Sequence, residues 1–381
     1  MSEYQYYEFR AIDRSLNAKE QSELRACSTR ARITATSFIN EYSWGNFKGN
    51  PNAWMEKYFD AFLYLANWGT RELQLRLPSS LLPIETAIAY CYTDCASVRE
   101  KNGRIILSLV SEEEPEGEWE EGEGWLSSII PVRAELARGD YRCLYLAWLL
   151  SVQQGEVDGE EEEPAVPDGL GELSGSVVSF ADFLRIDRDL LHAAAQTSLP
   201  FNLGRPTRED VFAWIRALSA GEKDDFLVRL MMEEEAHLGA EMHRKFLEEK
   251  RQDGHPSPKD RKRTVGELIR AGDEYREERR KAAAKNAAEK KARRGAEKAA
   301  LREKHLDTIA SREAETWLQV DHLIATKQPG RYNEATFLLI DLRDVATRKG
   351  KMKEFTERVT LLRNQHEKKP SLLKRLEKAG L

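Results

Sequence analysis

The 381-residue sequence has little cysteine and no long apolar run. Its four cysteines, Cys27, Cys91, Cys95 and Cys143, form no CxC or CxxC pair. This usage indicates a reducing compartment and argues against the usual structural zinc sites. No apolar stretch reaches the roughly 18 residues of a membrane-spanning helix, and the first residues have neither the basic start nor the apolar core of a signal peptide. We therefore expect a soluble cytoplasmic protein that contacts no membrane.

Catalytic signatures are also missing. The sequence contains no P-loop, no GxSxG elbow and no HExxH motif. The glycine-rich stretch 169–175 follows an acidic segment instead of a strand, so it lacks the strand, turn and helix of a dinucleotide cradle. Glu234, His237 and Glu241 share one predicted helix face, but the second Glu-x-x-His of a di-iron site is absent. We expect no catalytic residue, no cofactor and no metal site, and hence no enzyme.

What the sequence does have is charge, and it is distributed unevenly. The total of 59 Lys/Arg against 65 Asp/Glu gives a net charge of −6. Residues 1–250 hold 26 Lys/Arg against 44 Asp/Glu, a net of −18. Residues 251–305 hold 18 against 10, or +8, and residues 306–381 hold 15 against 11, or +4. The pattern is an acidic body that carries a basic end.

The first part of the chain predicts a small α/β domain. Asn17 with Glu20 forms a capping-box pattern that predicts a short helix. Asn50 and Pro51 predict a second helix, which we expect to run to about Asn67 because Gly69 can end it in a left-handed conformation. Its apolar residues lie on two faces, which predicts a buried helix. A stretch at 86–92 fits either a strand or a helix. Aromatic, β-branched or alternating stretches predict strands at 4–12, 33–42, 73–77 and 105–110.

The remainder predicts helices, which makes the whole chain α+β. Apolar residues at helical spacing from Tyr141 to Val152 predict one helix of a pair that closes the first domain. The last part reads as short antiparallel helices, similar to a small α-solenoid module, although no repeat of fixed period is present. The predicted segments are an α/β domain at 1–153, an acidic linker at 154–176, a helical domain at 177–258, a long basic helix at 259–305 and a C-terminal helical module at 306–381.

The basic helix is the candidate for contact with nucleic acid. Its cations could neutralise phosphates, but it has one aromatic residue, Tyr275, for stacking on bases. Acidic residues interleaved at helical spacing favour a solvated helix laced by ion pairs, and alanines every four residues from Ala284 to Ala300 leave a packed seam as another interpretation. The candidate phosphate contacts are Arg261, Lys262, Arg263, Arg279, Arg280, Lys281, Lys290, Lys291, Arg293 and Arg294.

Two parts of the chain resemble bacterial sequences. The segments 6–14, 66–71, 138–142 and 183–187 are similar to those of a bacterial family without an established activity, which implies no chemistry for this chain. The ending 366–376 resembles the helical tail of some bacterial SWIM-type zinc-finger proteins. SWIM zinc ligands begin with a CxC pair, which this sequence lacks. The resemblance therefore implies a shared packing or docking module and no shared metal site.

Our leading hypothesis is a non-enzymatic bacterial adaptor that binds a protein partner through residues 306–381. Large aromatic residues in such a module are either core residues or interface anchors. We expect Trp317 in the core, whereas Arg331 and Tyr332, just after Pro329, are the candidate exposed docking residues. A nucleic-acid-associated protein that uses the basic helix is the alternative. An enzyme whose site is assembled from residues distant in sequence is a third and weaker hypothesis.

Overall fold

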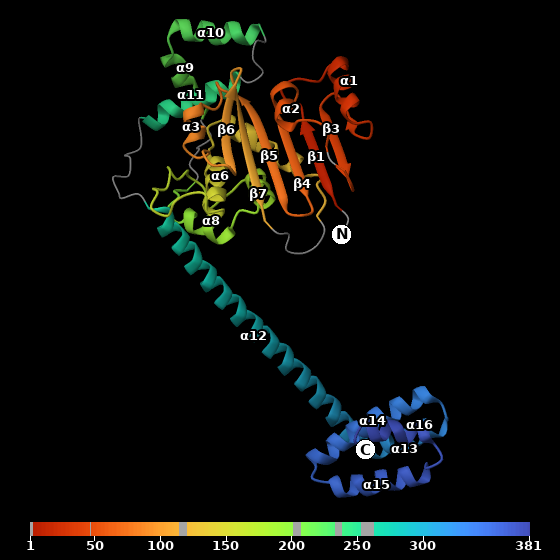
Figure 1. Ribbon diagram of the computed structural model, residues 1–381. Coiled ribbons are helices and arrows are strands. Elements are labelled where there is room, and N and C mark those ends of the chain that lie inside the picture. Colours follow the sequence, from red (N-terminus) through yellow and green to blue (C-terminus); the bar gives the residue numbers. More distant parts are fainter. Residues whose placement is uncertain (1–2, 46, 114–119, 201–206, 233–237, 253–262) are drawn as a thin grey trace. The chain divides into compact units, whose positions relative to one another are not determined.

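The computed structural model describes residues 3–45, 47–113, 120–200, 207–232, 238–252 and 263–381 (Figure 1). The chain divides into two compact units, Met1–Glu278 (unit 1) and Arg279–Leu381 (unit 2). The combination of an antiparallel sheet in unit 1 with many helices confirms the predicted α+β class. No helix in the described part of the chain is both long and apolar enough to span a bilayer.

A single antiparallel sheet organises unit 1. Within the described residues it has seven strands in the order β2-β3-β1-β4-β5-β7-β6. Central β5 pairs with β4 on one side and with β7 on the other, and every pairing is antiparallel. The strands are β1 (Gln5–Arg10), β2 (Arg32–Ile33), β3 (Ser37–Tyr42), β4 (Ala61–Ala66), β5 (Thr70–Pro78), β6 (Ala96–Lys101) and β7 (Arg104–Glu112).

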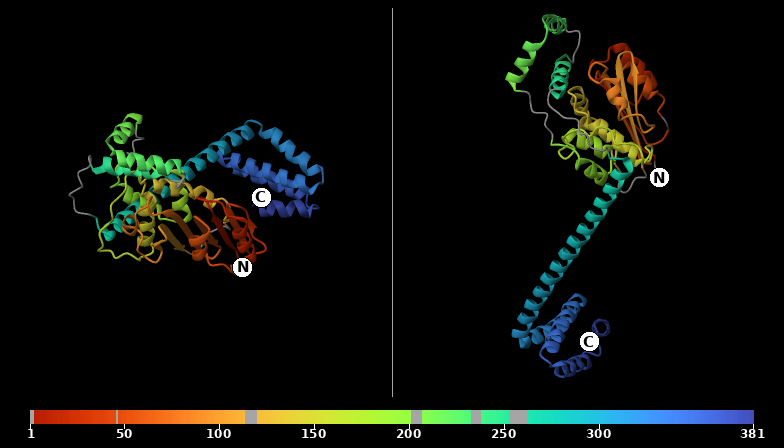
Figure 2. Two further views of the ribbon diagram at one scale, coloured as in Figure 1. Left: turned by 90° about the horizontal axis from the view of Figure 1, so that it is seen from above. Right: turned by 90° about the vertical axis from the view of Figure 1, so that its left-hand side faces the viewer.

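Helices pack on both faces of this sheet, and the right-hand view of Figure 2 shows α6 to α8 along one of them. The long helix α12 (Val265–Ser311) begins in unit 1 and continues into unit 2. The helices that lie wholly in unit 1 are α1 (Ala18–Cys27), α2 (Pro51–Lys57), α3 (Ile84–Ile88), α4 (Trp125–Ile129), α5 (Pro131–Ala137), α6 (Arg142–Gln153), α7 (Gly175–Phe183), α8 (Arg188–Ala195), α9 (Arg208–Ala217), α10 (Ala220–Met231) and α11 (Leu238–Gln252).

The alternation of strand side chains creates two cores. Leu73, Leu75 and Leu77 of β5 point to the face covered by α4 to α8, where the larger core also takes in the start of α12. On the opposite face, the aromatic residues Phe9 and Phe62 pack against α1 and α2 in a smaller core. The predicted alternating strand at 73–77 and the predicted capping box before α1 are both present.

The helix predicted from Asn50 to about Asn67 is wrong in its second half. Asn50 does cap α2, and its side chain accepts a bond from the Ala53 amide, but α2 ends at Lys57 and β4 follows. Most of β4 is apolar on both faces, because Ala61, Leu63 and Leu65 face the larger core and Phe62 faces the smaller one. A strand of this kind has the same apolar content as a buried helix, and periodicity alone does not separate them.

The predicted acidic linker, 154–176, lies inside unit 1 and packs against it. Val157 and Leu170 are buried in the larger core. Arg142 of α6 donates hydrogen bonds to the carbonyl oxygens of Gly169 and Glu172, which holds the end of the segment against the helix. The segment is therefore a structured loop of unit 1, and residues 1–153 and 177–258 belong to the same unit.

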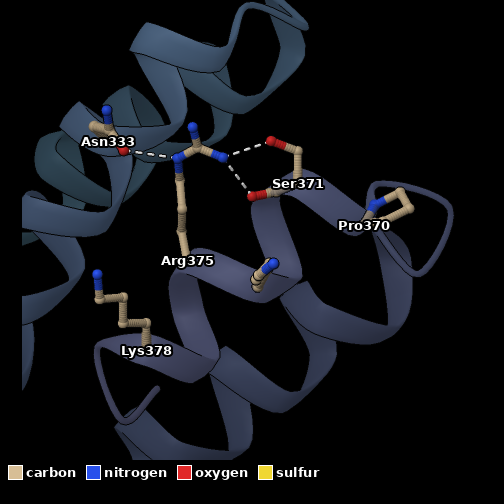
Figure 3. Close-up of a pocket in the computed structure, with 6 residues that line it drawn as sticks. Asn333, Pro370, Ser371, Arg375 and Lys378 are labelled. Atoms are coloured by element: carbon tan, nitrogen blue, oxygen red, sulfur yellow. Dashed lines mark hydrogen bonds between the residues drawn. The ribbon is translucent and has the colours of Figure 1, made fainter.

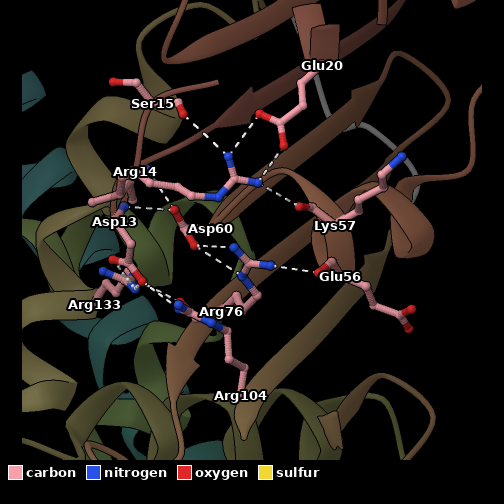
Figure 4. A network of polar contacts seen from close by, with 11 residues as sticks. Asp13, Arg14, Ser15, Glu20, Glu56, Lys57, Asp60, Arg76, Arg104 and Arg133 are labelled. Carbon is pink, nitrogen blue, oxygen red and sulfur yellow. Dashed lines mark hydrogen bonds and ion pairs between the residues drawn. The ribbon is translucent and has the colours of Figure 1, made fainter. Parts of the chain in front are cut away.

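A buried network of ion pairs ties the end of the sheet together (Figure 4). Asp60, which is fully buried before β4, pairs with Arg76 of β5 at 2.7 Å. Asp60 also accepts hydrogen bonds from the amides of Ile12 and Asp13 at 2.7 and 2.9 Å. The Asp13 carboxylate in turn pairs with Arg133 of α5 and with Arg104 of β7. The network thus links the loop after β1 to strands and a helix distant in sequence.

Unit 2 is built from helices around a core of its own. Trp317, Tyr332, Leu339 and Phe355 are among the buried residues of this core. The end of α12 is tied to the following helices by ion pairs from Arg302 to Asp341 and Asp344. After α12, the helices are α13 (Glu313–Ala325), α14 (Pro329–Arg348), α15 (Met352–Gln365) and α16 (Pro370–Lys378).

Candidate interaction sites

Of the ten candidate phosphate contacts, the structure describes eight, and one of these, Arg263, is packed against unit 1. Arg261 and Lys262 lie outside the described residues. Arg263 pairs with Glu163 at 2.8 Å and donates a hydrogen bond to the carbonyl oxygen of Ala193, and its side chain is 17 % exposed. The guanidinium of Arg263 is therefore part of the packing that anchors the start of α12. It is not free to contact a phosphate while this pair is made.

The other seven candidates lie on the part of α12 that is exposed on every side, residues 277–305. The alanines from Ala284 to Ala300 are exposed as well, so the described residues of the chain provide no packed seam for them. Arg293 pairs with Glu297 one turn away, as predicted for a solvated helix. The remaining members of the exposed set are Arg279, Arg280, Lys281, Lys290, Lys291 and Arg294.

Helical geometry places some of the exposed cations of α12 on one face of the helix and the others on its remaining sides. At about 100° per residue, Arg280, Lys291, Arg294 and Lys298 fall within about 60° of one another around the helix axis. The nearby acidic residue Glu289 falls on the opposite side by the same arithmetic. All five side chains are exposed. The exposed helix therefore carries a basic stripe, defined as Arg280, Lys291, Arg294 and Lys298.

The predicted exposed docking residue Tyr332 is wrong. Its side chain is 5 % exposed and belongs to the core of unit 2, like that of Trp317. The reason is that α14 already begins at Pro329, so Tyr332 lies on the same helical face as buried Ala335 and Leu339. Arg331 is exposed, as expected, and pairs with Glu334 on the next turn.

Other large side chains of unit 2 are exposed instead. Leu318 of α13 and Phe337 of α14 are each 67 % exposed, and Leu361 of α15 is 62 % exposed. Each belongs to a helix that also contributes buried apolar residues to the core. In the sequence, the strongest local sign of such an exposed residue is its position: it is apolar but lies outside the periodic apolar face of its helix.

A basic hollow of about 550 Å³ lies between α14 and α16 (Figure 3). Arg375 is fixed there, because its Nε donates to Asn333 Oδ1 at 2.7 Å and a terminal nitrogen donates to the carbonyl oxygen of Ser371. Lys374 and Lys378 are exposed at the same site. Three cations around one hollow suit a carboxylate or another anionic group. The remaining lining residue is Pro370.

The described residues provide no metal site and no reactive thiol in the core. Glu234 and His237 lie outside the described residues, and Glu241 pairs with Arg229 at 2.6 Å. No group of three or more His, Cys, Asp or Glu is arranged to hold a metal in the part of the chain that the structure describes. Burial raises the pKa of the Cys91 thiol to about 12 and raises that of Cys143 well above its usual range, so both remain protonated small core residues.

A further polar surface, which the sequence did not reveal, lies on the sheet itself. On the face that carries the smaller core, α1 and α2 cover the Phe9 and Phe62 positions. The next row of side chains across the strands contains Tyr7, Tyr64 and Glu72 in register, all of them half-buried. We call these three residues the tyrosine–glutamate row. Figure 1 shows β1, β4 and β5 continuing beyond α2 without a described helix over them.

The phenols of this row share one acceptor. The hydroxyl groups of Tyr7 and Tyr64 both donate to Gln5 Oε1, at 2.9 and 3.3 Å. The two rings lie 4.6 Å apart, and Phe47 stacks on the Tyr7 ring at 4.7 Å. Burial raises the pKa of both phenols, which keeps them neutral donors and acceptors. Alternating polar residues in the strands are the signal that could have identified the row, but their partners depend on strand register.

Comparison of the chain with known protein families, with curated proteins and with solved structures finds no match in any of the three.

Proposed function

We propose that the protein is a cytoplasmic, non-enzymatic adaptor that docks a protein partner through residues 306–381. The observation that carries the proposal is that this helical module has a core of its own and yet exposes Leu318, Phe337 and Leu361 on three successive helices. Large apolar side chains at the surface provide the buried contacts of protein interfaces. Consecutive short helices in this arrangement are also consistent with a small solenoid-like module.

The positive charge of residues 306–381 favours a particular kind of protein partner. The module has a net charge of +4, and the hollow between α14 and α16 adds three cations at one place. A complementary surface is acidic around an apolar centre, since opposite potentials favour encounter and fix the register of two proteins. We therefore propose an acidic protein partner, one of whose carboxylates enters the hollow beside Lys374 and Lys378.

Deletion of residues 306–381 tests this proposal. We expect unit 1 to remain folded, because its two cores contain no residue of the deleted segment. Partner recovery by affinity purification from the native host should be lost, and far-ultraviolet circular dichroism should confirm that the remaining protein is folded. Undiminished recovery of the partner after the deletion would place the docking surface on unit 1.

Point variants keep the module intact and sharpen the test. Lys374→Glu with Lys378→Glu should weaken binding of the purified partner about tenfold or more, because two attractive charges become repulsive. Lys353→Glu, an exposed lysine of α15, is the single-site control for a general change of charge and should alter affinity much less. Isothermal titration calorimetry measures both.

The second candidate function is binding of nucleic acid along α12. The basic stripe supports it, because four cations on one exposed helix face can contact successive phosphates. The acidic body, with a net charge of −18 over residues 1–250, opposes it through long-range repulsion of a polyanion. We therefore retain it as the alternative, and it predicts an affinity that depends steeply on salt.

The stripe gives this alternative a matched pair of variants. If α12 binds phosphates through the stripe, Lys291→Glu with Lys298→Glu should abolish binding to a short DNA duplex and lower the slope of log affinity against log salt by about one per lost contact. Lys285→Glu with Lys304→Glu changes the net charge equally on other sides of the helix and should be much milder. Equal effects of both pairs in a fluorescence anisotropy titration would contradict a specific stripe.

A further inference from the structure

The tyrosine–glutamate row offers hydrogen-bond acceptors and few donors. Both phenol hydrogens are already used, since Tyr7 and Tyr64 donate to Oε1 of the neighbouring Gln5. Gln5 itself is buried, and its amide nitrogen donates to the carbonyl oxygen of Gly45 at 3.0 Å. The Tyr7 ring is packed between Phe47 and Tyr64. What the two phenols still present to a ligand is their oxygen lone pairs and the face of the Tyr64 ring that is turned away from Tyr7.

Glu72 adds a carboxylate to this surface. It lies directly opposite Tyr64 in the strand register, where side chains on the same face are in contact distance. Its Oε1 accepts a hydrogen bond of 2.6 Å from Gln74, which is a neutral amide. Among the residues that the structure describes, no cation lies within ion-pair distance of Glu72. Burial raises the pKa of this carboxyl, so the fold disfavours its charged form.

The guanidinium of the neighbouring Arg99 does not form an ion pair with Glu72. Arg99 donates to Ser108 Oγ at 3.1 Å and to Asn52 Oδ1 at 3.0 Å, and it reaches Gln74 at 3.4 Å. Gln74 thus stands between the Arg99 guanidinium and the Glu72 carboxylate. Burial raises the pKa of Glu72 against the opposing effects of the hydrogen bond from Gln74 and the charge of Arg99, but Arg99 makes its hydrogen bonds to other residues. Glu72 is thus a half-buried carboxylate beside an aromatic ring that can still accept hydrogen bonds from a cation.

We propose that the tyrosine–glutamate row binds an arginine side chain presented by a partner protein. The guanidinium pairs with Glu72, and its plane lies against the Tyr64 ring, whose face attracts a cation. Additional N–H groups of the guanidinium donate to the phenol oxygens of Tyr7 and Tyr64. This site is on unit 1 and is independent of the docking surface proposed for residues 306–381.

The chemistry favours arginine over other occupants. The surface combines a carboxylate, two phenol oxygens and one face of the Tyr64 ring, and a planar group with five donors can use all of them at once. A lysine ammonium has three donors and is more strongly hydrated, so it gains less on half-buried rings. An acidic ligand is disfavoured by Glu72 and by the net charge of −18 over residues 1–250.

The test uses the full chain and fluorescein-labelled pentapeptides with alternating glycine and arginine, or glycine and lysine. The arginine peptide should bind saturably in a fluorescence anisotropy titration, and Glu72→Gln should weaken it about tenfold or more through loss of a charge-assisted pair. Glu209→Gln, at an exposed position of α9, is the matched control and should leave the affinity within about twofold. Tyr64→Phe, which keeps the ring and removes one acceptor, should cause a smaller loss than Glu72→Gln.

Thermal melting separates a binding role from a structural one. The folded state raises the pKa of Glu72, so the stability associated with its protonation is present at low pH and is lost as the pH rises through the raised value. At neutral pH, Glu72→Gln should therefore leave the melting temperature unchanged or raise it. A lowered melting temperature would assign Glu72 a structural role and overturn the proposal, as would equal affinity of Glu72→Gln and the wild type.

The remaining outcomes are equally decisive. Absence of saturable binding by the wild-type chain contradicts the site, and equal affinity for the lysine peptide contradicts the assignment to arginine. A change of oligomeric state in Glu72→Gln, measured by light scattering, would make a second copy of this chain the occupant instead of a partner. Loss of partner binding on deletion of residues 306–381 bears only on the other surface, so the two proposals fail separately.

Discussion

Replacing Asp60 by asparagine should cost unit 1 about 3–5 kcal/mol of its free energy of unfolding. Asp60 is fully buried and accepts four hydrogen bonds, two from the guanidinium of Arg76 and two from the amides of Ile12 and Asp13. Asparagine has nearly the same shape, but it carries no charge and one side of its amide is a donor. Either Arg76 or the two amides would then face a donor, and Arg76 would remain buried without its counter-charge.

Urea unfolding followed by circular dichroism measures this loss. A domain with a total stability of about 5–15 kcal/mol would lose a large fraction of it, so we expect the transition midpoint to fall markedly. The matched control is Asp225→Asn, which breaks an exposed ion pair with Arg229 on α10 and should cost no more than about 0.5 kcal/mol. Equal effects of the two variants would show that the Asp60 network contributes no more than a surface pair.

The elements that the sequence predicted well are those whose signal is local. The alternation of Leu73, Leu75 and Leu77 predicted β5, and the residues Asn17 and Glu20 predicted the start of α1 through contacts within four residues. The long charged helix also followed from composition, because alanine, lysine and glutamate favour a helix whatever packs around it. Each of these features is determined by residues only a few positions away in the sequence.

The elements that it missed depend on neighbours far away in the chain. β4 is a strand because β1 and β5 flank it, and nothing within the residues 61–66 themselves distinguishes it from a continuation of α2. That error also concealed Asp60, which a continuous helix would have placed on a helix face instead of at the start of a central strand. The proline and glycine before Tyr332 indicate a turn and hence a surface position for this residue, whereas in the structure they form the first turn of α14.

The candidate sites, too, differ in whether they depend on residues close together or far apart in the sequence. The basic stripe follows from helix periodicity once α12 is known to be exposed. The tyrosine–glutamate row brings together residues from β1, β4 and β5, and a shift of one residue in any pairing would turn its side chains to the other face. Arg263 is the opposite case. In the sequence it looks like one more surface cation, but in the structure its side chain is held by Glu163, a hundred positions earlier.

Replacing Arg263 by alanine should therefore act on stability, with an expected cost of about 3 kcal/mol. Glu163 is 5 % exposed, and it accepts from Arg263 Nε and Nη2 at 2.8 Å each and from the hydroxyl of Tyr145. Without the Arg263 guanidinium, the buried Glu163 carboxylate would keep the Tyr145 hydroxyl as its partner. The Arg263 carbonyl oxygen also accepts from the Glu163 amide, which aligns the acidic loop with the start of α12.

A matched surface arginine isolates this effect. Arg188→Ala removes a pair with Asp182 in which the arginine is 83 % exposed, and it should change the stability of unit 1 by less than about 0.5 kcal/mol. We expect Arg263→Ala to lower the midpoint of urea unfolding far more and to speed hydrogen exchange in residues 264–268, because the loop no longer holds the first turn of α12. If the two variants were equally stable, Arg263 would be available at the surface after all, and its original assignment as a phosphate contact would regain its physical basis.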